Sequence, residues 1–121
     1  MTPASTLILY EPAPSPAKVQ ASVLAYPAAR GPAEEAARDL AGNGFRVRAA
    51  EIGPHLDEDM LARLAADSQR IVTAGEGPIG GAVREALGRL GLRTPVLSLG
   101  PGSLTRDHIS EACLRNFPAS K

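Results

Sequence analysis

The sequence predicts an α/β fold in which helices cover both faces of a mostly parallel sheet of about five strands, a three-layer sandwich. Short aliphatic runs alternate with amphipathic stretches along the 121 residues, and the loops between them are short. Hydrophobic residues make up 44% of the chain but aromatic residues only 3%, so small aliphatic side chains must form the core. This length supports one hydrophobic core rather than two.

The first half begins with an edge strand at residues 7–10 and a proline-rich, extended lead at residues 11–17. We therefore divide the chain into an N-terminal strand and lead (1–18) and a single domain (19–121). The domain opens with a buried strand at residues 19–26. A helix follows from Gly31 and Pro32, ending in the Gly-Asn-Gly turn at residues 42–44. Its inner stripe is expected to be Ala33, Ala36, Ala37 and Leu40, with Glu34 and Glu35 near the positive end of the helix dipole.

The second half continues the alternation. Strands are expected at residues 45–52, 71–74 and 96–99. Three helices lie between and after them, the first capped by Asp57 and the last by Ser103 or Thr105. Their predicted inner stripes are Met60, Leu61 and Leu64, then Ala82, Val83, Ala86, Leu87 and Leu90, with Gly91 closing that helix, and finally Ile109, Ala112 and Cys113.

Composition excludes several classes of protein. Thirteen basic residues balance thirteen acidic ones, so no general charge draws the chain to nucleic acid or to an anionic membrane. No stretch approaches the roughly 20 apolar residues of a membrane span, and residues 1–14 lack the pattern of a secretory signal. The single cysteine fits a reducing compartment. These observations predict a cytoplasmic protein. Its Met1 start and proline-rich lead favour a natural small protein over an excised domain.

The order of several short motifs is similar to that of one family module. The segment HLDE at residues 55–58 follows a strand, and VTAGEG at residues 72–77 precedes the double glycine of Gly80 and Gly81. The strand PVLSLG follows at residues 95–100. This order resembles the C-terminal domain of transketolase-like thiamine diphosphate enzymes, a group that includes transketolase, deoxyxylulose-phosphate synthase and the 2-oxoacid dehydrogenase E1 β chain. Two departures stand out, because the family has proline at His55 and glutamate at Gly75.

The resemblance implies a part of a larger enzyme. In that family this domain does not hold the cofactor, so we expect no catalytic or cofactor-binding residue and no activity from the chain alone. Thiamine diphosphate and Mg²⁺ would belong to partner subunits. The implied role is that of a small subunit or third domain of a split transketolase-like enzyme, which completes the assembly and shapes the active-site entrance. The free chain is expected to be a monomer or homodimer.

The candidate interface lies where loops leave the carboxyl ends of the strands. Open α/β sheets bind ligands at that edge, and free N–H groups at a helix start can hold an anion there. The expected residues are Tyr26, Glu76, Gly77, Gly80, Gly81, Gly100 and Ser103. A tight turn and close packing of a helix on the sheet explain the glycines more simply, because no Lys or Ser/Thr follows them as in a P-loop. On either account, a bulky residue at Gly81 should disturb the docking surface or the helix packing behind it.

Other interpretations remain open. The segments YPAARG (26–31), AGEGP (74–78) and LGPGS (99–103) are similar to turns of diacylglycerol-kinase-like lipid kinases, which predicts a degenerate nucleotide-binding domain. A free-standing adaptor is a third hypothesis. His55 and His108 have no second metal ligand at a suitable spacing, and Cys113 is expected to be a small buried hydrophobe.

Overall fold

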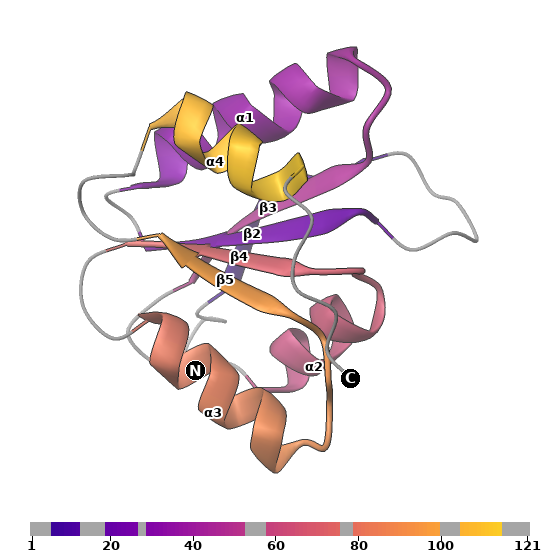
Figure 1. The fold of residues 1–121 in the computed structure, drawn as a ribbon, viewed down its shortest axis with the longest axis vertical. Helices are drawn as coiled ribbons and strands as arrows, with labels where there is room; N and C mark the ends of the chain where they lie inside the picture. Colours follow the sequence, from indigo (N-terminus) through magenta and orange to yellow (C-terminus); the bar gives the residue numbers. More distant parts are fainter. Residues whose placement is uncertain are drawn as a thin grey trace.

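A computed structural model describes residues 6–12, 19–26, 29–52, 58–75, 79–99 and 105–114. Strands and helices alternate after an initial pair of strands (Figure 1). In chain order they are β1 (Thr6–Tyr10), β2 (Ala21–Ala25), α1 (Arg30–Gly42), β3 (Val47–Ile52), α2 (Glu58–Ala66), β4 (Ile71–Ala74), α3 (Ile79–Arg89), β5 (Val96–Leu99) and α4 (Arg106–Leu114).

The sheet has the strand order β1-β3-β2-β4-β5. Four strands run parallel, whereas β1 pairs antiparallel with β3 at the edge predicted for it. The connections from β2 to β3, from β3 to β4 and from β4 to β5 each contain a helix, as parallel pairing requires. The predicted five-stranded, mostly parallel α/β fold is confirmed. In the described part of the chain, no helix is long and apolar enough to cross a membrane.

Helices cover both faces of the sheet. Figure 1 shows α1 and α4 on one side and α2 and α3 on the other. The first side packs through small residues, because Ala33, Ala36 and Ala37 of α1 are fully buried against the sheet, beside Ile109 and Cys113 of α4. Small side chains let the helix approach the strands closely, which explains how a core with so few aromatic residues is filled.

The start of α1 differs from the prediction. The helix begins at Arg30, one residue before Gly31, so Glu34 and Glu35 lie beyond its first turn and do not face the N-terminal dipole. Glu34 instead accepts a hydrogen bond from Arg38 Nε at 2.9 Å, one helical turn further on. The end is as predicted, because Gly44 has a φ of +89° and the Phe45 amide donates to Leu40 at 3.0 Å.

The inner stripes on the opposite side are partly corrected. Val83, Ala86 and Leu87 of α3 are buried, but Ala82 is exposed. Leu90 lies beyond the last residue of α3 and is 40% exposed, because the helix ends at Arg89 before its stripe completes. In α2, Leu61 and Leu64 are buried, with Ala65 beside them, and Met60 is half-buried. The predicted cap Asp57 lies outside the described residues.

The last helix agrees with its prediction. Thr105 caps α4, because its hydroxyl oxygen accepts from the His108 amide at 3.3 Å. Ile109, Ala112 and Cys113 are buried as expected. Burial raises the pKa of the Cys113 thiol to about 12, against a smaller lowering effect of the Arg70 charge. The thiol therefore stays protonated at neutral pH and behaves as a small core residue.

Candidate functional site

The candidate site lies at the carboxyl ends of β2 and β4, which are neighbouring parallel strands paired up to Ala25 and Ala74. The helix after β2, α1, covers one face of the sheet, and the helix after β4, α3, covers the other (Figure 1). This is a topological switch point, where the two following loops diverge and leave a crevice. In open α/β sheets such a position is the usual place for a ligand or partner group.

Tyr26 and Gly75 meet at this point. Tyr26 directly follows β2, and its amide donates to the carbonyl oxygen of Ala74 at 3.1 Å. A Cβ atom placed on Gly75 would lie 3.0 Å from Tyr26 Cδ2 and 3.1 Å from Tyr26 Cβ. The tyrosine therefore packs directly over the glycine backbone. A side chain at position 75 would therefore press on Tyr26 in this structure.

A charged pair stands beside them. Arg30, the first residue of α1, donates to Glu51 Oε1 at 3.3 Å near the carboxyl end of β3. The arginine side chain is 57% exposed, so the pair contributes little to stability but gives this edge a polar rim. No local sequence pattern connects this pair, because the two residues lie 21 positions apart on different elements.

The structure describes only some of the predicted site residues. Tyr26 lies at the site, and Gly80 and Gly81 form part of the first turn of α3. The other four predicted residues, Glu76, Gly77, Gly100 and Ser103, lie outside the described residues. Their part in an interface or in anion binding therefore remains a prediction. His55 lies outside them as well, and His108 is exposed at the start of α4.

Gly81 is not required for close packing of α3 on the sheet, in contrast to one of the two explanations that the sequence offered for its glycines. The residue is exposed, and a Cβ atom added to it would meet nothing within 4 Å. The helix behind it therefore does not depend on the missing side chain. The part of the prediction that concerns a docking surface is untouched by this finding.

Replacing Gly81 with alanine is expected to raise the free energy of unfolding by about 0.5–1 kcal/mol. Alanine has a higher helix propensity than glycine, and the new methyl group has room. Urea denaturation of the two proteins measures the difference. A loss of stability of the same size would mean that the turn before α3 requires glycine.

The described groups at this edge are an aromatic ring, a buried hydroxyl and an ion pair. Within residues 6–12, 19–26, 29–52, 58–75, 79–99 and 105–114, no group of three His, Cys, Asp or Glu side chains could hold a metal ion. Thr73, in the strand that leads to Gly75, is fully buried, and its hydroxyl has no partner among the described residues. A half-buried aromatic ring and an ion pair with an exposed arginine suit contact with another surface.

Comparison with known proteins supports the fold. No family model matches the sequence. A structure described as a split-gene transketolase in an inactive β4 tetramer has a TM-score of 0.79 and 24% identity over 93% of this chain. A 2-oxoglutarate:ferredoxin oxidoreductase from Magnetococcus marinus, solved with 2-oxoglutarate, coenzyme A and succinyl-CoA bound, has a TM-score of 0.66 and 11% identity over 88% of this chain.

These likenesses define the class of fold. The chain spans 41% of the transketolase chain and 18% of the oxidoreductase chain, so it corresponds to a part of each. At these identities the likeness is one of architecture. It confirms the transketolase-like fold that the order of the motifs predicted, and it leaves activity and partners open.

Proposed function

We propose that this chain is a non-catalytic subunit or domain of a split, thiamine diphosphate-dependent transketolase-like enzyme of the cytoplasm. The observation that carries the proposal is the likeness to a split-gene transketolase over 93% of this chain but only 41% of the other. A piece of that extent fits a detached domain. In the family that the sequence resembles, the domain of this kind leaves the cofactor to others. Thiamine diphosphate and Mg²⁺ would accordingly be held by partner subunits.

The proposed docking surface is the carboxyl edge of the sheet around Tyr26 and Gly75, extended by the first turn of α3. Its position at the switch point of the sheet favours this edge over the other surfaces. The described residues there include the half-buried Tyr26, the buried Gly75, the exposed Gly81 and the Arg30–Glu51 pair. Such a surface can complete an assembly and line the entrance to a site built by other subunits.

Co-expression with candidate cofactor-binding subunits tests the proposal. We expect the ketol-transfer rate and the size of the complex to increase when the chain is present. The variant Gly81→Arg places a large charge on the proposed surface without filling packed space, and it should weaken both effects. Glu35→Arg, an exposed position on α1, is the matched control and should leave both unchanged. Rates and complex sizes that do not respond to the chain would refute the proposal.

Two further measurements separate the alternatives. Calorimetry of the chain alone with thiamine diphosphate and Mg²⁺ is expected to give no saturable heat, and micromolar binding would contradict the assignment of the cofactor to partners. Titration with ATP and Mg²⁺, followed by amide chemical shifts, tests the kinase-like interpretation. Shifts confined to the turns before α3 and α4 would favour a nucleotide-binding domain instead.

A further inference from the structure

The outer edge of β5 is open in the described structure. Within the sheet formed by the described strands, β5 is the last strand, with β4 on one side only. The Ile71 amide of β4 donates to the Pro95 carbonyl oxygen at 2.8 Å. Because backbone groups alternate in direction along a strand, those of Val96 and Ser98 face away from β4. An extended chain could pair with them.

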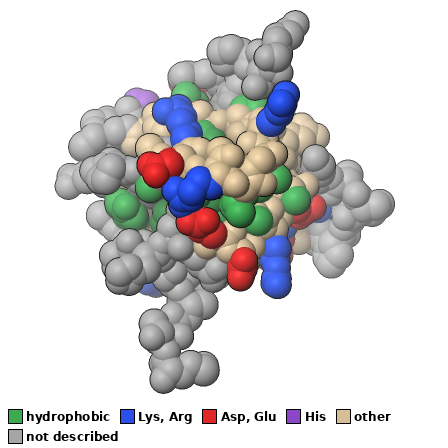
Figure 2. All heavy atoms as spheres, turned by 90° about the horizontal axis from the view of Figure 1, so that it is seen from below, with side chains coloured by type: hydrophobic (Ala, Val, Ile, Leu, Met, Phe, Trp, Pro, Cys, Tyr) green, Lys and Arg blue, Asp and Glu red, His purple; other side chains and the backbone are tan. Residues whose placement is uncertain are grey.

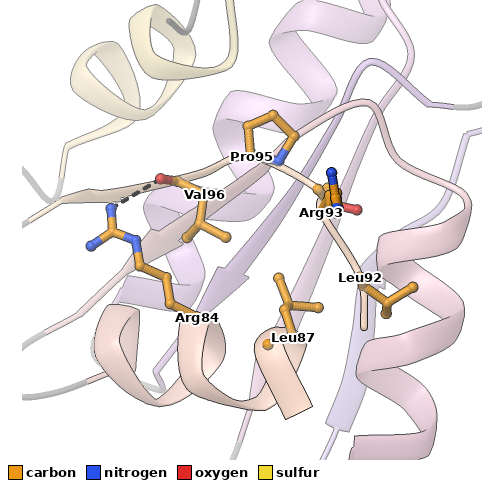
Figure 3. Close-up of a pocket in the computed structure, with 8 residues that line it drawn as sticks. Arg84, Leu87, Leu92, Arg93, Pro95 and Val96 are labelled. Atoms are coloured by element: carbon orange, nitrogen blue, oxygen red, sulfur yellow. Dashed lines mark hydrogen bonds between the residues drawn. The ribbon is translucent and has the colours of Figure 1, made fainter. Parts of the chain in front are cut away.

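Arg84 of α3 occupies one of these outward groups. Its Nη2 atom donates to the Val96 carbonyl oxygen at 3.0 Å, as Figure 3 shows. The bond covers an exposed acceptor of an edge strand with a charged side chain, which opposes unspecific pairing. This hydrogen bond can be replaced by another. An incoming backbone amide would donate to the Val96 carbonyl oxygen, and the Arg84 guanidinium would then bind a carboxylate.

A hollow of about 470 Å³ opens beside this edge, between the end of α3 and the loop that leads into β5 (Figure 3). Its apolar floor includes Leu87, Leu92 and Val96, and the charged groups among its described lining residues are Arg84 and Arg93. None of the described residues that line it is acidic. Arg93 is exposed, and no hydrogen bond or ion pair joins it to a described residue. A second hollow on the other side of Arg93 extends the surface toward Gln69.

The ion pairs of the neighbouring helices that the structure describes do not include these two arginines. Glu58 of α2 and Glu85 of α3 both pair with Arg89. Figure 2, which views the molecule from the α2–α3 side, shows such charged groups interspersed with hydrophobic side chains on this face. Among the described residues, no ion pair involves Arg84 or Arg93, which lie beside the apolar hollow and the outer edge of β5.

We propose that the outer edge of β5, together with the hollow lined by Arg84 and Arg93, is a docking site for an extended, acidic segment of a partner protein. The segment would add a strand to β5, place carboxylates on the two arginines and set an apolar side chain into the hollow. This surface is separate from the carboxyl edge around Tyr26, and the proposal does not depend on the thiamine enzyme assignment.

Charge decides between the possible occupants. The chain's own C-terminal segment, residues 115–121, contains Arg115 and Lys121 and no acidic residue, so like charges would oppose its binding here. A second copy in a two-fold pair would place this patch against itself and bring the same arginines together. An acidic segment from another protein would form hydrogen bonds with the outward backbone groups of β5 and bring negative charge to Arg84 and Arg93.

Binding of a model peptide to the full chain tests the site. The probe is a labelled peptide of about eight residues with alternating Glu and Val, and the control has Lys in place of Glu. We expect saturable binding of the acidic peptide alone, weakened by added salt, with the largest amide shifts at Val96 and Ser98. Arg93→Glu should raise its Kd about tenfold.

Two variants separate backbone pairing from charge. Ser98→Pro removes an outward amide without removing a bond to β4 and should abolish binding. Arg38→Glu, an exposed arginine on α1, is the control for charge and should leave the Kd unchanged. The proposal is overturned if Arg93→Glu or Ser98→Pro binds normally, if both peptides bind equally, if the shifts centre elsewhere, or if β5 instead mediates dimerisation of the free chain.

Discussion

Replacing Arg48 with alanine is expected to lower the free energy of unfolding by about 3 kcal/mol. The Arg48 side chain is only 8% exposed and joins three parts of the chain at the amino end of the parallel strands. Its Nε lies 2.9 Å from a Glu11 oxygen, and its Nη2 lies 2.7 Å from Glu11 and from Asp67. Its loss removes several charge-assisted hydrogen bonds at once.

The electrostatics of the cluster favour the charged, paired form of Arg48. Burial by itself lowers the pKa of the Arg48 guanidinium, but hydrogen bonds and charge attraction from Glu11 and Asp67 outweigh it and hold the pKa above its usual value. A group with a raised pKa contributes its full stabilisation below its unfolded-state pKa, so the cluster is intact at neutral pH. The two carboxylates are about half exposed, which keeps the loss at the lower end for a broken buried ion pair.

Urea denaturation compares the Arg48→Ala variant with Arg38→Ala. Arg38 has a similar hydrogen bond to Glu34 at 2.9 Å, but its side chain is 59% exposed, and we expect a loss of about 0.5 kcal/mol. Amide hydrogen exchange should also become faster in β1, which Glu11 directly follows. Equal losses in the two variants would contradict the role given to burial.

The Arg48 cluster also marks a limit of sequence analysis. Its partners Glu11 and Asp67 lie 37 and 19 positions away, and no local pattern connects them. The strands at residues 71–74 and 96–99 could be predicted to the residue, because aliphatic runs there are bounded by glycine or proline. Neighbouring residues in the sequence are enough to predict these two strands. The Arg48 cluster forms only when the folded sheet brings its three residues together.

Helix boundaries show a different limit. Proline is tolerated throughout the first turn of a helix, so Pro32 did not reveal that α1 begins at Arg30. The apolar stripe of α3 likewise continues to Leu90 in the sequence, although the helix ends at Arg89. At the candidate site, Tyr26 lies at the carboxyl edge of the sheet, where the motifs placed the interface, and the role of that edge stays a prediction. The contact of Tyr26 with Gly75 joins two residues 49 positions apart, and no local pattern in the sequence predicts it.

That contact leads to the second large effect. Replacing Gly75 with alanine is expected to lower the free energy of unfolding by about 1–3 kcal/mol, because the new methyl group would press on the base of the Tyr26 side chain. The nearest atoms, Cδ2, Cβ and Cγ of Tyr26, all lie between 3.0 and 3.2 Å from the added Cβ. These atoms are close to the backbone, which a hydrogen bond from the Tyr26 amide to Ala74 holds in place at 3.1 Å.

A double-mutant cycle assigns the cost to this pair. In a Tyr26→Gly background all three contacting atoms are absent, so Gly75→Ala should cost at least about 1 kcal/mol less than in the native background. Gly81→Ala is the matched control, because its methyl group has room and its effect should be the same in both backgrounds. The same cost for Gly75→Ala with and without Tyr26 would show that the glycine is required by the turn itself.

A measured coupling would establish that Tyr26 and Gly75 are packed as one unit. The carboxyl edge would then present a fixed surface to a partner, and Gly75→Ala would be expected to weaken assembly by displacing Tyr26.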